Sequence, residues 1–182
     1  TVRAVAAAVR SRPERSAPVV CPVPMSARLG AGGVRGAWRA VLTPNGAKGW
    51  IERSAVEDDG VAESAGIWGP CSPRGPRPNP DSISRATVDR CVARAMAILG
   101  APYRWGGVTP WGIDCSGLIR LILGLEGVGL PRDAGKQRES LAEWERPVSP
   151  AAIRAGDLVF FGARAGVIDH VGFGIGGRPG RF

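Results

Sequence analysis

Residues 112–123 read GIDCSGLIRLIL and place Cys115 between an aspartate and a serine, directly ahead of an apolar run. The run has the composition of a buried helix, so Cys115 is predicted to lie where a loop becomes a helix. The N–H groups of a first helical turn carry partial positive charge and stabilise a thiolate, the reactive form of cysteine. Asp114 fits the cap of this helix, although its negative charge opposes a thiolate. The stretch therefore marks Cys115 as a candidate nucleophile, with first-turn amides as a candidate oxyanion hole.

The composition indicates a globular chain with one or two domains. It has 182 residues, a formal net charge of +8 that comes mostly from arginine, 27 glycines and 16 prolines. The glycine and proline content predicts short elements joined by many turns. The arginines form no basic cluster with interleaved aromatics, so they are interpreted as solvated surface charge and no nucleic-acid partner is predicted. No window approaches the ~18 apolar residues of a membrane-spanning helix, so no transmembrane segment is predicted.

The other three cysteines have weaker signals. Cys91 falls at helical spacing among apolar residues, which predicts a small core side chain. Cys21 and Cys71 lie beside prolines, and a disulfide between them in an oxidising compartment is one interpretation. No two cysteines are spaced C-x-x-C, so no metal site is predicted, and no cofactor either.

A linker is predicted at residues 70–82, PCSPRGPRPNPDS, because five prolines exclude a helix or a central strand there. It divides the chain into residues 1–69 and residues 83–182. The first part is predicted to form a small, partly open β-barrel with a strand over Trp38–Leu42, a turn at PNG, and a second strand around residues 50–51. The stretch GAGGVRG at residues 30–36 is predicted to be another glycine turn.

The second part is predicted to be an α+β domain. A helix is expected over Ser84–Leu99, and a second from Cys115 to Gly124 or Gly127, with the glycine-rich loop APYRWGGVTPWGID between them. A loop is expected to hold LPRDAGKQ, and strands are expected in GDLVFFG at residues 156–162 and in DHVGFGIG at residues 169–176. His170 in the last strand is the chain's one histidine, so any Cys/His reaction within this chain must use it.

Two resemblances join these observations. The pattern of residues 38–51 resembles a bacterial SH3 domain, which implies an SH3-like β-barrel over residues 1–69. The blocks LGAPYRWGG, GIDCSGL, LPRDAGKQ, GDLVFFG and DHVGFGIG resemble, in their order, the NlpC/P60 family of papain-like cell-wall peptidases. That resemblance implies helices packed on an antiparallel sheet over residues 83–182, with Cys115 as nucleophile and His170 as base.

An SH3 half in front of such a domain is similar to enzymes that cut peptidoglycan stem peptides at the γ-D-glutamyl to diamino-acid bond. The resemblance implies that Tyr103, Asp114 and Ser116 hold the free amino end of the substrate's L-alanine, as oxygen acceptors suit an ammonium group. The expected partner is therefore a stem peptide or muropeptide. The expected compartment is the bacterial cell envelope or the exterior, with a cytoplasmic role in wall recycling as the alternative.

One departure from the family concerns the residue that orients the catalytic imidazole. The family places a third polar residue after the histidine strand, whereas here VGFGIGGRPGRF follows His170 and supplies no His, Asn or Gln. Asp169 is expected to point to the opposite face of the strand. A truncated or altered C-terminal segment is therefore expected. Two alternatives to the hydrolase stay open: a wall-binding protein with weak or no catalysis, and a Cys/His acyltransferase.

Overall fold

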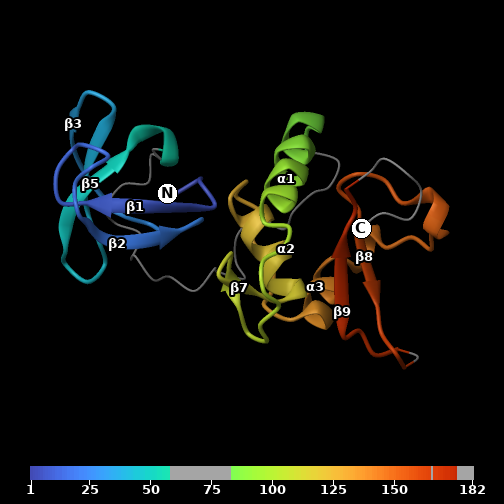
Figure 1. The fold of residues 1–182 in the computed structure, drawn as a ribbon. Helices are drawn as coiled ribbons and strands as arrows, with labels where there is room; N and C mark the ends of the chain where they lie inside the picture. Colours follow the sequence, from blue (N-terminus) through green and yellow to red (C-terminus); the bar gives the residue numbers. More distant parts are fainter. Residues whose placement is uncertain (58–82, 165, 176–182) are drawn as a thin grey trace. The chain divides into compact units, whose positions relative to one another are not determined.

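A computed structural model describes residues 1–57, 83–164 and 166–175 (Figure 1). The chain divides into two compact units, Thr1–Gly69 with Thr109–Trp111 and Pro70–Val108 with Gly112–Phe182. The predicted linker at residues 70–82, Cys71 and the last seven residues lie outside the described part of the chain.

The N-terminal unit is built on a five-stranded antiparallel sheet with the order β2-β1-β5-β4-β3. Its strands are β1 (Ala6–Arg10), β2 (Val19–Pro24), β3 (Gly30–Arg35), β4 (Trp38–Leu42) and β5 (Lys48–Glu52), followed by a 3-10 turn at Arg53–Ala55. The predicted strand over Trp38–Leu42 is confirmed residue for residue, and Trp38 pairs with Glu52 at the open end of the predicted hairpin. Gly46 closes its turn at φ +83°, a conformation that favours glycine.

One expectation for this unit is wrong. GAGGVRG is mostly strand rather than turn, because residues 30–35 pair with β4 and the turn itself is at Gly36, with φ +57°. The sheet is open, with β2 and β3 at its two edges, so a closed barrel is not shown and the partly open SH3-like barrel stays a prediction. Five aliphatic side chains form its buried core: Val2, Val9, Val23, Val41 and Ile51. The unit thus has a real core on a small sheet.

The second unit combines helices with a β-hairpin. Its elements are α1 (Arg85–Ala97), β6 (Val108–Thr109), β7 (Gly112–Ile113), α2 (Cys115–Gly124), α3 (Ala134–Ser140), 3-10 turns at Ala142–Trp144 and Pro150–Ala152, β8 (Leu158–Phe161) and β9 (His170–Phe173). Both predicted helices and both predicted strands are present, each within a few residues of the expected bounds. LPRDAGKQ is not all loop, because α3 begins inside it at Ala134.

The core of this unit lies between α2 and its neighbours. Ile119 and Ile122 on α2 are fully buried, as are Val171 and Phe173 on β9 to within a few per cent. Figure 1 shows α2 and α3 beside the β8–β9 hairpin, and both helices contact β9. The apolar run after Cys115 is therefore buried as predicted, and its burial fixes the direction of the helix that begins at Cys115.

Cys91 is a core residue, as predicted. It is 2% exposed on α1, and its Sγ lies 3.9 Å from the carbonyl oxygen of Ile122 on α2. Burial raises the pKa of the Cys91 thiol, and the nearby charge of Glu126 raises it further. This thiol is therefore structural rather than reactive.

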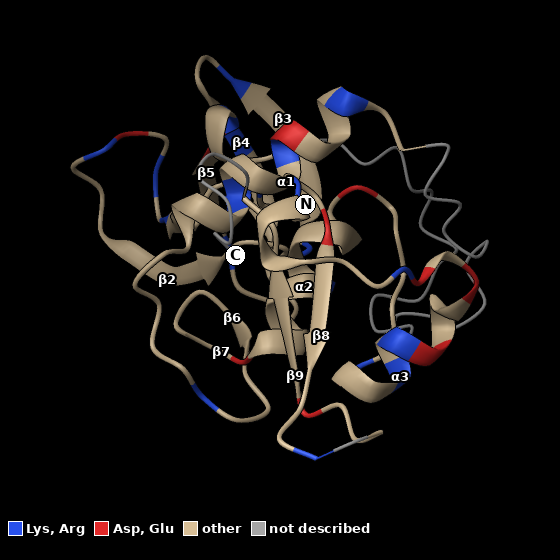
Figure 2. Ribbon diagram, turned by 90° about the vertical axis from the view of Figure 1, so that its right-hand side faces the viewer, with Lys and Arg blue, Asp and Glu red and all other residues tan. Residues whose placement is uncertain are grey.

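Charge is distributed over many elements. Figure 2 shows basic residues on strands, helices and loops, and both signs of charge on α3. None of the helices in the described part of the chain has the length and apolar character needed to cross a bilayer.

Candidate active site

Cys115 is the first residue of α2, and Asp114 caps that helix. The Asp114 carboxylate accepts a hydrogen bond from the amide of Gly117 at 2.7 Å, and the Asp114 carbonyl accepts from the amide of Leu118 at 2.9 Å. Cys115 carries a free, half-buried thiol. The cysteine therefore lies at the loop-to-helix junction that the sequence predicted. At such a junction the N–H groups of the first turn point out of the N-terminal end of the helix.

A second partner of Asp114 comes from the segment that precedes α3. Arg132 donates from one guanidinium nitrogen to Asp114 Oδ1 at 2.9 Å and to Ser116 Oγ at 2.8 Å. Its other terminal nitrogen donates to Asp114 Oδ2. Arg132 thus binds both neighbours of Cys115 in the sequence. The sequence analysis missed this residue, although LPRDAGKQ was one of the matching blocks, because spacing alone does not show which loop residue folds back onto the helix.

These donors determine the charge state of Asp114. Burial, with 7% of the residue exposed, pushes its pKa upwards, but hydrogen bonds from Arg132 and from the amides of Gly117 and Gly106 outweigh burial and hold the pKa of Asp114 below its ordinary value. Asp114 is therefore a carboxylate near neutral pH, and its charge is matched by Arg132.

The loop at residues 101–107 lies directly against the start of α2. The Gly106 amide donates to Asp114 Oδ2 at 2.8 Å, and the Asp114 amide donates to the Gly107 carbonyl at 3.2 Å. A Cβ on Gly117 would lie 2.2 Å from the Gly107 oxygen, so this close approach requires glycine at position 117. Ser116 and Gly117 thus keep the neighbourhood of Cys115 small, as expected.

Tyr103 belongs to the same loop and reaches Cys115. Its backbone bridges Ile113, and its hydroxyl lies close enough to interact electrostatically with Cys115, while 62% of the residue is exposed. Partial burial raises the pKa of the Tyr103 hydroxyl, and the charges of Cys115 and Asp114 raise it further. The structure therefore brings Tyr103, Asp114 and Ser116 together around Cys115; their roles stay predictions.

His170 is the first residue of β9, the strand on which α2 packs. Its imidazole lies beside the Phe161 ring, with centroids 5.0 Å apart, because Phe161 and His170 are paired across the hairpin. The neighbouring Asp169 carboxylate faces the hairpin loop and accepts from the Ala163 amide at 3.4 Å. This agrees with the expectation that Asp169 does not orient the imidazole.

Helix α3 links the segments that carry Cys115 and His170. The Gln137 side chain is fully buried and donates to the carbonyl oxygens of Ser116 at 3.0 Å and Pro131 at 2.9 Å. Two residues earlier, the backbone at Gly135 lies against the Ile168 carbonyl, 3.6 Å from an ideal Cβ. One short helix therefore contacts both the residue after Cys115 and the segment that leads into His170. Gln137 is a second residue that the sequence analysis did not single out.

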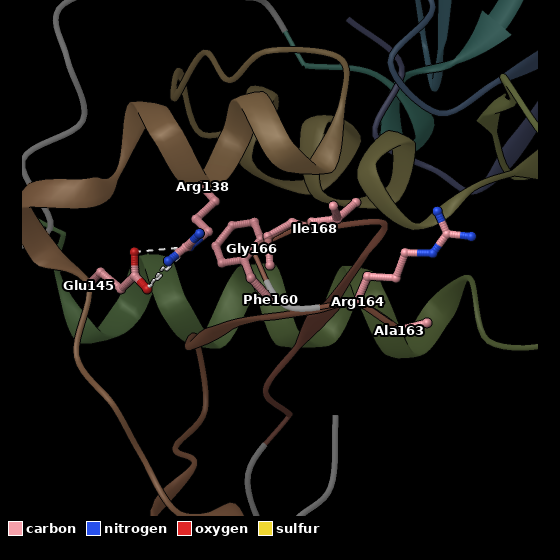
Figure 3. Close-up of a pocket in the computed structure, with 9 residues that line it drawn as sticks. Arg138, Glu145, Phe160, Ala163, Arg164, Gly166 and Ile168 are labelled. Carbon is pink, nitrogen blue, oxygen red and sulfur yellow. Dashed lines mark hydrogen bonds and ion pairs between the residues drawn. The ribbon is translucent and has the colours of Figure 1, made fainter.

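A shallow hollow lies beside the β8–β9 loop (Figure 3). It has a volume of about 330 Å³ and is lined by Arg138, Glu145, Phe160, Gly162, Ala163, Arg164, Gly166, Val167 and Ile168. Figure 3 shows Arg138 paired with Glu145, while the Arg164 guanidinium points away from that pair. Phe160 faces this hollow from the strand position next to Phe161, so the hollow and His170 are presented from opposite faces of the hairpin.

No group of three His, Cys, Asp or Glu side chains within residues 1–57, 83–164 and 166–175 is placed to hold a metal ion. The chemistry that the described residues offer is that of a thiol at a helix start, next in sequence to a carboxylate that is paired with an arginine and near a tyrosine hydroxyl. This arrangement defines a cysteine-dependent site at the start of a helix that packs against a β-hairpin.

Comparison with known proteins finds a family match in the C-terminal half of the chain. Residues 100–179 match the NlpC/P60 family, so the chain carries an NlpC/P60 domain in its C-terminal half. A γ-D-glutamyl-L-lysine dipeptidyl-peptidase of Bacillus subtilis is 38% identical over 100 residues, which are 54% of this chain and 32% of that protein. The Bacillus cereus protein of the same name is 30% identical over 139 residues, 75% of this chain and 35% of that protein. This chain thus spans about a third of the length of these two relatives.

Two further similarities agree with this result. A probable endopeptidase p60 of Listeria innocua is 39% identical over 85 residues, 47% of this chain and 17% of that protein. The crystal structure of an NlpC/P60 family protein from Bacillus cereus superposes with a TM-score of 0.62 at 23% identity, covering 96% of this chain and 50% of that one. That structure shares the mixed α/β fold with this chain.

Proposed function

We propose that this chain is a cysteine endopeptidase that hydrolyses peptidoglycan stem peptides at the bond between γ-D-glutamate and the diamino acid. One observation carries the proposal: within an NlpC/P60 domain, a free thiol begins a helix that packs on the strand beginning with the chain's one histidine. Relatives named for γ-D-glutamyl-L-lysine cleavage support the choice of bond.

The reaction is acyl transfer through a thioester. His170 takes the proton of Cys115, and the thiolate attacks the γ-carbonyl carbon of the D-glutamyl residue. His170 then protonates the amine of the diamino acid as the C–N bond breaks, and water, deprotonated by His170, releases the glutamyl product and the thiol.

Two backbone amides of α2 are proposed to stabilise the oxyanion of this reaction by donating hydrogen bonds to it. Gly117 donates to the Asp114 side chain and Leu118 to the Asp114 carbonyl, so both are engaged. The amides of Cys115 and Ser116 are then the first-turn donors left for the substrate. Of the three residues proposed to recognise the free amino end of L-alanine, Tyr103 is the most exposed, whereas the Asp114 carboxylate and the Ser116 hydroxyl already accept hydrogen bonds from Arg132.

The N-terminal unit is proposed to be an SH3-like module that binds wall peptide. Its small antiparallel sheet supports this, as does the match to the Bacillus cereus relative, whose 139 residues extend beyond the NlpC/P60 region. The envelope is the corresponding compartment.

The test is hydrolysis of purified muropeptides, analysed by mass spectrometry. The wild-type chain is expected to release L-alanyl-γ-D-glutamate, and Cys115→Ala to release none, whereas the matched variant Cys91→Ala keeps the site residues and is expected to cleave. Hydrolysis by Cys115→Ala at the wild-type rate would exclude the mechanism. A wild-type product in which an added amine replaces water would indicate an acyltransferase, and binding without turnover would indicate a wall-binding protein.

A further inference from the structure

Arg132 is the charged group most closely tied to the start of α2. Its three hydrogen bonds to side chains reach Asp114 and Ser116, the residues on either side of Cys115. Two parallel bonds to one carboxylate fix the guanidinium plane, which a single-point contact does not. Arg132 therefore restrains the backbone on both sides of the thiol.

The same contacts solve an electrostatic problem at this helix start. A carboxylate at the N-cap stabilises the helix, but its negative charge disfavours a thiolate on the next residue. Arg132 places a positive charge against that carboxylate in a partly buried setting, with 30% of its side chain and 8% of the Asp114 side chain exposed. The helix thus retains its cap while the charge of the cap is offset.

We propose that Arg132 is a positioning residue that holds the start of α2 and keeps Cys115 reactive by offsetting the charge of Asp114. This inference rests on the proposed peptidase function, since it assigns Arg132 to the same site. The proposal explains why an arginine occupies position 132 in LPRDAGKQ, which the overall charge of that segment does not explain.

Other groups around Cys115 come from each neighbouring segment. Tyr103 approaches from the loop at residues 101–107, Asp133 precedes α3 and acts on Arg132, and His170 begins β9. The charged residues of α1 that face α2, Arg90 and Arg94, pair with Glu126 beyond the opposite end of α2. Arg132 is therefore the cation that the structure places against Asp114.

The experiment measures the rate of Cys115 alkylation by iodoacetamide from pH 5 to pH 9, followed by peptide mass spectrometry. Arg132→Gln is expected to be alkylated about tenfold more slowly than the wild type at pH 7. Arg132→Lys is expected to recover part of that loss, because it restores the charge without the two-point contact. The matched control is Arg138→Gln on α3, whose guanidinium pairs with exposed Glu145, and its profile is expected to coincide with that of the wild type.

A double variant separates charge from folding. Asp114→Asn with Arg132→Gln removes both charges, and Asn is also a good helix cap, so the alkylation rate of Cys115 is expected to return towards the wild-type rate. Protection of Cys91 from the reagent reports in each variant that α1 still packs on α2. A wild-type alkylation rate in folded Arg132→Gln, or a double variant as slow as the single one, overturns the proposal. Because alkylation requires no turnover, wild-type protein that is alkylated as expected but fails to cleave muropeptides would refute the proposed function alone.

Discussion

The ion pairs at the end of α2 give a prediction whose size follows from the structure. Glu126 accepts hydrogen bonds from Arg90 at 2.6 and 3.1 Å and from Arg94, and its side chain is 9% exposed. Glu126→Gln keeps the volume and removes the charge, which leaves two arginines without their counter-ion. Breaking a buried pair in this way costs about 3–5 kcal/mol. Because half of Arg90 is exposed and stays solvated, about 2 kcal/mol is expected here.

Cys91 is a built-in reporter of this loss. It lies under the same α1–α2 contact and becomes accessible only when the two helices separate. A loss of about 2 kcal/mol corresponds to a roughly 30-fold faster labelling of Cys91 at pH 7 under conditions in which opening is an equilibrium. The matched control is Glu139→Gln on α3, because its partner Lys136 is 3.8 Å away and both side chains are exposed.

The pH dependence of the same protection has a definite sign. The arginines hold the pKa of Glu126 below its ordinary value of 4.5 despite burial, so the carboxylate stabilises the fold above pH 4.5 and this contribution is lost as pH falls through the lowered pKa. Labelling with a dipyridyl disulfide, which reacts in acid, is expected to show wild-type protection falling below about pH 4.5. In Glu126→Gln, most of this fall in Cys91 protection at low pH is expected to disappear. The part that remains is expected to come from protonation of Asp114. Wild-type labelling rates in Glu126→Gln, or an equal effect of Glu139→Gln, would refute this reasoning.

Three further predictions test other parts of the structure. Gly49→Ala is expected to destabilise the N-terminal unit by about 1–3 kcal/mol in thermal unfolding, because its Cβ would lie 2.5 Å from a Val9 methyl, whereas Gly33→Ala meets nothing within 4 Å and should be nearly neutral. Ile119→Ala is expected to cost about 2–5 kcal/mol in urea unfolding, since the side chain is fully buried; a cost below about 1 kcal/mol would contradict the packing of α2. Tyr103→Phe is expected to lower kcat/KM about tenfold for stem peptides with a free amino end and little for N-acetylated ones. Equal losses on both substrates would exclude its role in recognising the amine.

Local patterns in the sequence predicted α1, α2, the β4–β5 hairpin, β8, β9 and the place of the candidate nucleophile, but they did not predict β1, β2 or α3. Alternation over residues 38–42 and the turn that follows determine a hairpin through neighbouring residues, and the structure confirms it. The apolar run after Cys115 predicts a helix whose first residue is that cysteine, because a capping aspartate and a buried face are both short-range signals. The NlpC/P60 resemblance was likewise carried by contiguous blocks and is confirmed over residues 100–179.

The glycine stretch at residues 30–36 was misjudged because its strand state depends on a partner. Glycine favours turns by itself, but pairing with β4 draws residues 30–35 into the sheet edge. A Cβ on Gly32 would lie 3.1 Å from the Cβ of Ala40, so the absence of a side chain at Gly32 suits the close pairing of β3 with β4. Edge pairing is a tertiary property that composition does not report.

What the sequence by itself determined is the location of a capped helix start with a thiol and the identity of the one histidine. What only the tertiary structure decided is the environment of that thiol: Arg132, 18 positions after Asp114, folds back to bind its carboxylate, and Gln137 ties α3 to Ser116. The physical reason is that helix propensity and capping act over a few residues, whereas charge compensation acts through space. Which distant side chain neutralises a buried carboxylate is settled only when the chain packs.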